Sequence, residues 1–285
     1  MMDEWLQAIL IGVILGAVVG NLSSGPGTDV PKSTAQTMAK KKKKALCIGC
    51  NYTNSPNMTL YGCVSDAERM ARMLSSRGYD VDLLTSNVTR LRVLAAMAKL
   101  VVEGQPGDQL VLQFSGHGSY VGDVSGDEAD GRDECLVLED GQYLLDDDMN
   151  AIVRVLKPGI DMRIIFDCCH SGSSLDFAFA YQAGSIGNLI LRKASSTAST
   201  TASANVVYLG ACRDNETAAD TVNASGTPTG ALTEPVLEAL TKKPDASCYE
   251  VLCAATNYCQ ENGYDQRPQL SSLGDIVVDG VQFIP

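Results

Sequence analysis

Two short apolar segments, each followed at once by a loop of glycines and reactive side chains, constrain most strongly what this chain can fold into. The first, Gln109 to Phe114, leads into Ser115-Gly116-His117-Gly118-Ser119. The second, Met162 to Phe166, leads into Asp167-Cys168-Cys169-His170-Ser171-Gly172. Such segments are typical of buried strands, and open α/β sheets carry their chemistry at the carboxyl ends of their strands. A cysteine and a histidine at the ends of neighbouring strands are suited to act as a nucleophile and its base.

The segments around these loops alternate between strand and helix patterns. Further strands are predicted at Ala45 to Ile48, Val81 to Leu84 and Val206 to Ala211. Capping boxes are predicted at Ser65-Asp66-Ala67-Glu68 and Ser247-Cys248-Tyr249-Glu250. This alternation predicts a mainly parallel sheet covered by helices on both faces. The predicted helices run from Ser65 to Arg77, Thr89 to Val102, Asp146 to about Val155 and Ser247 to about Glu261.

The N-terminal 44 residues differ in composition from the rest. Trp5 to Leu22 is uncharged and mostly apolar, and about 18 such residues suffice for one membrane helix. The acidic start and the run Lys40 to Lys44 favour an anchor at residues 5–22 with the C-terminal domain facing the cytosol. The alternative is a buried or disordered pro-segment. For the lysine run, contact with anionic lipid and proteolytic cleavage both stay open.

Charge and cysteine usage exclude some classes of protein. The net charge is −12, which argues against a nucleic-acid-binding protein, because binding to phosphates needs clustered cations. Hydrophobic residues make up 45% of the chain, enough for a sizeable core. Several of the ten cysteines lie in apolar runs and two are adjacent. Reduced core thiols are therefore favoured over a disulfide framework.

The order and spacing of the two catalytic-type motifs carry a family resemblance. Phe114-Ser115-Gly116-His117-Gly118 and Asp167-Cys168-Cys169-His170-Ser171-Gly172 resemble motifs of the metacaspases, with a type I-like core, in the caspase-like cysteine peptidase clan. The similarity runs from about Ala45 to about Leu273. It implies a caspase-like three-layer α/β/α sandwich with a mainly parallel central sheet, a monomeric catalytic domain and a Cys–His dyad.

Cys169 is the predicted nucleophile and His117 its general base. A free thiol has a pKa of about 8.5, so a neighbouring imidazole is needed to take its proton. The resemblance selects Cys169 over Cys168, because in the family the cysteine directly before His-Ser-Gly is the nucleophile. Alternation along the strand end is expected to point the two thiols in opposite directions. The backbone N–H groups of Gly118 and Cys169 are the expected oxyanion donors; the alternative is two buried thiols and a core histidine.

Four residues resemble the family's substrate pocket. Asp66 and Asp167 match its two acids, and Cys63 and Ser115 match the rest of its wall. A buried guanidinium has to be paired with carboxylate, so the two acids predict cleavage after arginine or lysine. The alternative for Asp66 is an acid in a first helical turn, stabilised by the helix dipole.

A calcium site is implied by the same resemblance. Asp133, Asp146, Asp147 and Asp176 match acids that bind calcium in the metacaspases that the chain resembles. Carboxylate oxygens are hard ligands that suit calcium, and four of them without a cation would repel one another. Calcium is the expected cofactor and activity switch. The alternative is a solvated acidic loop over residues 123–148.

The peptidase region is predicted to divide at a linker. A large-subunit-like part, 45–178, is followed by a flexible linker, 179–205, and a small-subunit-like part, 206–285. Arg192 and Lys193 lie beside a Ser/Thr/Ala tract in the linker. An enzyme that cuts after basic residues is expected to cleave itself there.

The sequence thus predicts a calcium-activated cysteine endopeptidase that cleaves protein substrates after arginine or lysine. Two alternatives stay open. One is a relative with a different residue preference. The other is a pseudopeptidase that acts as a calcium-dependent scaffold.

Overall fold

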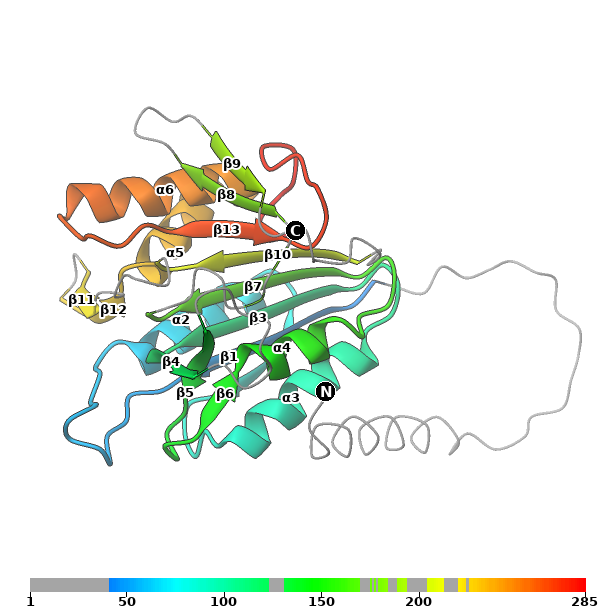
Figure 1. The fold of residues 1–285 in the computed structure, drawn as a ribbon. Coiled ribbons are helices and arrows are strands. Elements are labelled where there is room, and N and C mark those ends of the chain that lie inside the picture. The colour runs from blue at the N-terminus through cyan, green and yellow to red at the C-terminus, as the bar shows by residue number, and fades with distance from the viewer. Residues whose placement is uncertain are drawn as a thin grey trace, which may run out of the picture.

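The fold is described from a computed structural model of the chain (Figure 1). For residues 189–193 and 220 the description covers the backbone alone. The predicted membrane anchor at 5–22 lies outside the described residues, and so does Asp176. The structure describes residues 41–122, 131–169, 175, 177, 179–183, 189–193, 204–212, 220–223 and 226–285.

The described residues form a central eight-stranded sheet in the order β2-β1-β3-β7-β10-β13-β8-β9. The strands from β2 to β10 in this order are parallel, and β13, β8 and β9 continue the sheet in antiparallel fashion. The predicted mainly parallel sheet is therefore confirmed. Its strands are β1 (Lys43–Gly49), β2 (Asp80–Leu84), β3 (Gln109–Ser115), β7 (Asp161–Asp167), β8 (Phe179–Ala183), β9 (Leu189–Lys193), β10 (Asn205–Gly210) and β13 (Gln269–Ser272).

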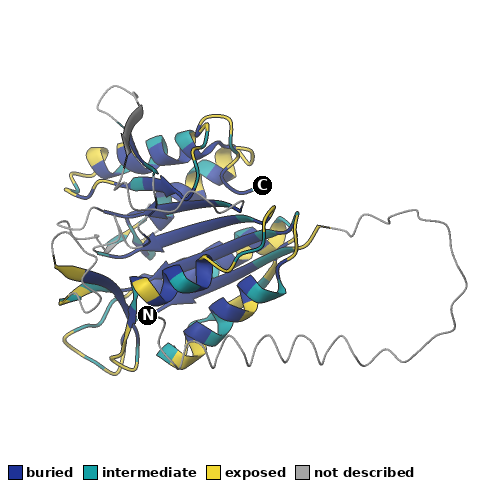
Figure 2. Cartoon of the chain, turned by 45° about the vertical axis from the view of Figure 1, so that its right-hand side comes forward, coloured by how far each residue is buried: buried dark blue, intermediate teal, exposed yellow. Residues whose placement is uncertain are grey.

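Helices cover both faces of this sheet and complete the predicted three layers. Apolar side chains of α2, α5 and α6 pack with one set of alternating strand residues, and those of α3 and α4 pack with the other set. Figure 2 shows the central strands buried and the outer sides of the helices more exposed. The helices are α2 (Cys63–Ser76), α3 (Arg90–Glu103), α4 (Asp146–Val153), α5 (Thr233–Lys242) and α6 (Cys248–Glu261).

Two small sheets lie outside the central one. Within the region predicted as an acidic loop, residues 123–148, the described residues contain β5 and β6. These strands join β4 in an antiparallel sheet whose apolar side chains belong to the core on the α3 and α4 face. The second small sheet pairs β11 with β12. Their strands are β4 (Gly118–Gly122), β5 (Arg132–Val137), β6 (Tyr143–Leu145), β11 (Asp220–Val222) and β12 (Pro228–Gly230).

The register of the parallel strands aligns the ends that carry the motifs. Gly49 on β1 lies opposite Ser115 on β3, and Ser115 lies opposite Asp167 on β7. The ladder continues past the strands, because the N–H of Gly116 donates to the carbonyl oxygen of Asp167 at 3.3 Å. The His and Cys motifs therefore follow side by side from the carboxyl ends of two adjacent central strands.

One predicted capping box is confirmed and the other is wrong. Ser247 and Glu250 form both hydrogen bonds of the box at the start of α6. By contrast, α2 begins at Cys63, two residues before Ser65, and has no side-chain bond from its N-cap, Gly62. The side chain of Asn51 accepts the N–H of Val64 at 3.0 Å. A donor in the first turn is thus satisfied from the preceding loop, so the helix does not need Ser65 as a cap.

Two predicted segment boundaries also need correction. The flexible linker predicted over 179–205 contains β8 and β9, which pair in the central sheet. The apolar side chains of Phe179 and Tyr181 in β8 pack with the core on the α2, α5 and α6 face, so β8 extends the sheet beside β13. The lysine run is not wholly a linker, because Lys43 and Lys44 belong to β1 and the Lys44 ammonium pairs with Glu103 at 2.5 Å. Among the described residues, no helix is long and apolar enough to cross a membrane.

Candidate active site

The loops that carry His117 and Cys169 are in direct contact. Each residue lies two positions beyond a paired strand end, His117 after Ser115 and Cys169 after Asp167. There is no room for a side chain at Gly118, because a Cβ at this position would lie 1.9 Å from the Cys169 carbonyl oxygen. Glycine is required at this point so that the two backbones can approach. The predicted dyad is therefore brought to one place.

The two adjacent cysteines differ sharply in their surroundings. Cys168 is 1% exposed and belongs to the core on the α3 and α4 face, whereas Cys169 is partly exposed. Burial raises the pKa of the Cys168 thiol well above its ordinary value. Because only thiolate is a strong nucleophile, Cys168 is unsuited to catalysis. Cys169, the partly exposed cysteine of the two, stays the predicted nucleophile.

A backbone carbonyl holds the ring of His117. Nε2 of His117 lies 2.8 Å from the carbonyl oxygen of Met58, in the segment between β1 and α2. A carbonyl oxygen can only accept, so Nε2 carries the proton in the neutral ring. Nδ1 is then the nitrogen with a lone pair that can take a proton from a thiol. No pattern of side chains in the sequence identifies Met58, because the group that acts is its backbone.

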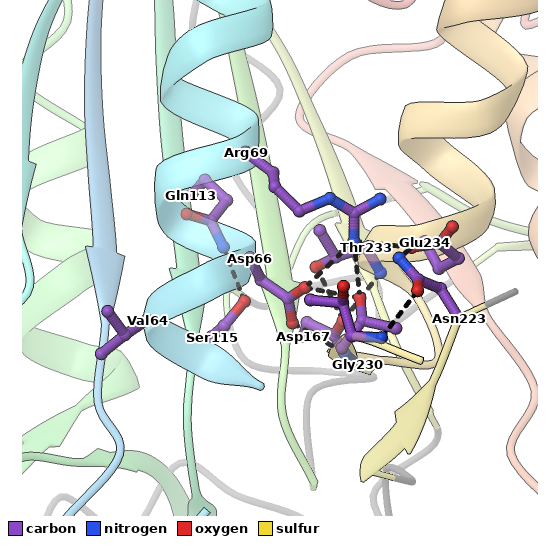
Figure 3. Close-up of polar contacts among 12 residues, drawn as sticks. Val64, Asp66, Arg69, Gln113, Ser115, Asp167, Asn223, Gly230, Thr233 and Glu234 are labelled. Atoms are coloured by element: carbon purple, nitrogen blue, oxygen red, sulfur yellow. Dashed lines mark hydrogen bonds and ion pairs between the residues drawn. The ribbon is translucent and has the colours of Figure 1, made fainter. Parts of the chain in front are cut away.

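The two pocket acids come together around Gly230 (Figure 3). One oxygen of Asp66 accepts from the Thr229 hydroxyl at 2.5 Å, and the other accepts from the Gly230 N–H at 2.7 Å. One oxygen of Asp167 accepts from both the N–H and the hydroxyl of Thr233 at 2.7 Å. A Cβ at Gly230 would lie 2.2 Å from that Asp167 oxygen. The segment 229–233, which holds both carboxylates, is not part of the predicted pocket.

The remaining predicted pocket residues lie close to these acids. Ser115 is buried and lies opposite Asp167 in the sheet, and its hydroxyl accepts from the Gln113 amide at 2.7 Å (Figure 3). Cys63 begins the helix that carries Asp66 and interacts electrostatically with Cys168. The structure thus brings together the predicted pocket residues beside the Cys motif.

Asp66 is a buried acid that lies close to a second acid, Asp167. Burial and the nearby Asp167 carboxylate raise the pKa of Asp66 to about 8, against the lowering effect of its hydrogen bonds and of Arg69. The Arg69 guanidinium lies 3.9 Å from Asp66 and is itself paired with Glu234 at 2.6 Å. A cationic side chain entering here would relieve the repulsion between the two acids.

Comparison with known proteins identifies the family. The family model described as "Metacaspase, peptidase C14 domain" matches residues 43–178. A Metacaspase-1 from Schizosaccharomyces pombe is 34% identical, with 88% of this chain and 71% of that protein aligned. The chain belongs to the metacaspase family. A Metacaspase-1 from Cryptococcus neoformans is also 34% identical over 81% of this chain, and the chain spans 62% of the length of that relative.

Solved structures confirm the caspase-like fold of this metacaspase. The crystal structure of the Geobacter sulfurreducens protein GSU0716 superimposes with a TM-score of 0.63 at 25% identity, covering 85% of this chain and 98% of that one. The Drosophila initiator caspase Dronc superimposes with a TM-score of 0.51 at 14% identity, covering 87% and 91%. The second likeness concerns the fold alone.

The acids predicted to bind calcium are only partly assembled by the described residues. Asp133 on β5 and Asp146 at the start of α4 are both 2% exposed, whereas Asp147 is exposed. Because Cys135 pairs with Leu145, Asp133 and Asp146 lie at the same end of the small sheet. Their carboxylates suit a hard cation in kind. In the described part of the chain, however, no three acid, histidine or cysteine side chains are close enough to hold a metal ion.

The predicted self-cleavage residues lie in a strand and not in a linker. Arg192 and Lys193 end β9, where they pair with Ala180 and Phe179 of β8. A peptidase binds its substrate as an extended, unpaired chain, so the bond after Arg192 has to leave the sheet before it can be cut. Lys193 is the last residue of the strand. Self-cleavage at these residues stays a prediction.

Proposed function

We propose that this metacaspase is a cysteine endopeptidase that cleaves peptide bonds after arginine or lysine. The observation that supports this most is the pair of buried carboxylates, Asp66 and Asp167, beside the loop that carries Cys169. A cationic side chain placed between them gains charge-assisted hydrogen bonds to both. An acidic side chain placed there would meet like charge.

The chemistry follows from the positions of the two catalytic groups. Nδ1 of His117 takes the proton of the Cys169 thiol, and the thiolate sulfur attacks the carbonyl carbon of the substrate. The resulting oxyanion is stabilised by backbone N–H donors, for which Gly118 and Cys169 remain the candidates. The imidazolium then gives its proton to the leaving amine, and water hydrolyses the thioester to regenerate the thiol.

The residue preference is tested with matched fluorogenic peptides that differ only in the residue before the scissile bond. We expect hydrolysis after arginine and lysine, and kcat/KM about 10³-fold lower after aspartate, because a like charge at a buried site costs several kcal/mol. Preferential hydrolysis after aspartate would overturn the proposed pocket. Binding of an arginyl peptide without hydrolysis would favour the scaffold.

Calcium is proposed as the activator of this peptidase. Asp133 on β5 and Asp146 at the start of α4 are buried acids at the same end of the small sheet, and their carboxylate oxygens suit a hard cation. Calcium bound by these acids would order the chain around them. Asp147 and Asp176 are proposed as further ligands on the family resemblance.

Calcium binding is measured apart from activity, by the thermal unfolding midpoint. Millimolar calcium is expected to raise the Tm of the wild-type chain, since a ligand that binds only the folded state stabilises it by about 2.7 kcal/mol at 100 times Kd. Asp146→Asn should lose this shift, and Asp82→Asn, an exposed acid paired with Lys99, should keep it. An equal shift in both variants, or none in the wild type, would exclude calcium from Asp146.

A further inference from the structure

The segment between β1 and α2, residues 50–62, packs on the loop that carries His117. Within it Tyr52 is 3% exposed and has a left-handed backbone, with φ +53°. Residues with a side chain rarely adopt this conformation, and it persists where surrounding contacts determine it. The contacts of the Tyr52 side chain therefore indicate why the chain keeps it there.

The hydroxyl of Tyr52 replaces one hydrogen bond of the β4–β5 ladder. Gly118 lies opposite Leu136, so the adjacent rung joins His117 to Val137. A regular antiparallel rung of this kind has two backbone hydrogen bonds. One is present, from Val137 N–H to the His117 carbonyl oxygen at 2.9 Å. In place of the other, His117 N–H donates to the Tyr52 hydroxyl at 2.7 Å, and that hydroxyl donates to the Val137 carbonyl oxygen at 2.7 Å.

The same side chain also contacts the imidazole. The ring of Tyr52 lies against that of His117, with centroids 4.8 Å apart and planes inclined at 37°. Its hydroxyl is tightly enclosed by the turn, because a Cβ at Gly116 would lie 2.6 Å from the hydroxyl oxygen. Both the backbone and the ring of His117 are thus located by one tyrosine.

We propose that Tyr52 is a positioning residue that sets the placement of His117 relative to Cys169. The proposal rests on the proposed peptidase activity. Two hydrogen bonds in series hold the His117 amide farther from β5 than a single direct bond would. Without the hydroxyl, the rung closes to a direct N–H···O bond of about 2.9 Å. The His117 backbone then moves toward β5, which changes the position of the base relative to the thiol.

Tyr52→Phe tests this inference, because it keeps the ring and removes only the hydroxyl. We expect kcat on an arginyl peptide to fall by about 10²-fold, the cost of misplacing a catalytic group by about 1 Å, while KM stays nearly unchanged. Alkylation of Cys169 by iodoacetamide is followed by mass spectrometry of its peptide. In Tyr52→Phe the alkylation rate should reach half its maximum at a higher pH than in the wild type. The thiol ionises less readily when its proton acceptor has moved.

The matched control is Tyr79→Phe. Tyr79 is also buried, and its hydroxyl donates to the Pro285 carbonyl oxygen at 3.2 Å, away from both motifs. This variant should keep the wild-type kcat and alkylation profile. Gly116→Ala provides a second test, since it retains the hydroxyl of Tyr52 but displaces it, and it should change both readouts in the same direction as Tyr52→Phe. Thermal unfolding of each variant checks that it is folded.

The outcomes separate the two proposals. If the wild-type chain hydrolyses the peptide and Tyr52→Phe matches it in kcat and in alkylation profile, Tyr52 does not position the base. If the wild-type chain hydrolyses no peptide, the proposed function fails. The alkylation profiles of wild type and Tyr52→Phe then still decide whether Tyr52 acts on the thiol through His117.

Discussion

Replacing Cys169 with alanine is expected to lower kcat by about 10⁶-fold, the cost of removing the nucleophile from a catalytic unit of this kind. The reason is the division of roles between adjacent cysteines. Cys169 is partly exposed and its backbone contacts Gly118 of the His loop, whereas Cys168 is buried in the core. The measurement is hydrolysis of a fluorogenic arginyl peptide under the conditions that give maximal wild-type activity.

The neighbouring cysteine supplies the matched control. Cys168→Ala removes a sulfur one residue away, but from the apolar side of the loop. We expect a loss of stability of about 1 kcal/mol, as for a small truncation in a packed core, and kcat within a few-fold of wild type. Loss of activity in Cys168→Ala with activity retained in Cys169→Ala would exchange the two roles. Equal loss in both would indicate that the loop, and not one thiol, had been disrupted.

The elements that the sequence predicts correctly are determined by residues within or next to each element. The strands before the two motifs are mostly apolar, apart from the buried Gln113 and Arg163, as expected for parallel strands with both faces buried. The capping box at Ser247 and Glu250 is satisfied within four residues of chain. Neither feature depends on contacts with distant parts of the chain, so the sequence pattern predicts both correctly.

The features that the sequence does not reveal depend on distant contacts or on backbone groups. The start of α2 is fixed by Asn51, which lies in the preceding loop. The proton position on His117 is fixed by the carbonyl of Met58, which any residue type carries. The sequence predicts a linker where β8 and β9 lie, because β8 pairs with β13, which comes much later in the chain, and β9 then pairs with β8.

The proposed substrate pocket is predicted from the sequence only in part. The family resemblance places the acids Asp66 and Asp167, and the structure brings them together. The resemblance does not reveal that Thr229, Gly230 and Thr233 donate to those carboxylates, because the segment that contains them is about 60 residues or more from either acid in the chain. Side-chain identity predicts which charges are present, whereas the hydrogen bonds that orient them appear only in three dimensions.

At a pH above 8, where Asp66 is ionised, Asp66→Asn is expected to lower kcat/KM for an arginyl peptide by about 10³-fold. Breaking one side of a buried charge pair costs about 3–5 kcal/mol, and each factor of ten corresponds to about 1.4 kcal/mol. Asparagine keeps the shape, and its single oxygen can accept from the Gly230 N–H while its amide N–H donates to the Thr229 hydroxyl oxygen, so the variant removes the charge and reverses one hydrogen bond. Glu68→Gln is the control, because it removes one charge from the solvent face of the same helix; it should leave kcat/KM unchanged.

The pH dependence gives this prediction a second, independent readout. The pKa of Asp66 is raised to about 8 by burial and by Asp167, so below that pH the carboxyl is largely neutral and attracts a cation less. Wild-type kcat/KM for the arginyl peptide should therefore rise as the pH increases through about 8, because kcat/KM reports groups of the free enzyme. A bound cation favours the ionised acid, so kcat should lack this limb. Asp66→Asn should lose the limb from kcat/KM, and its persistence in that variant would assign the ionisation to another group.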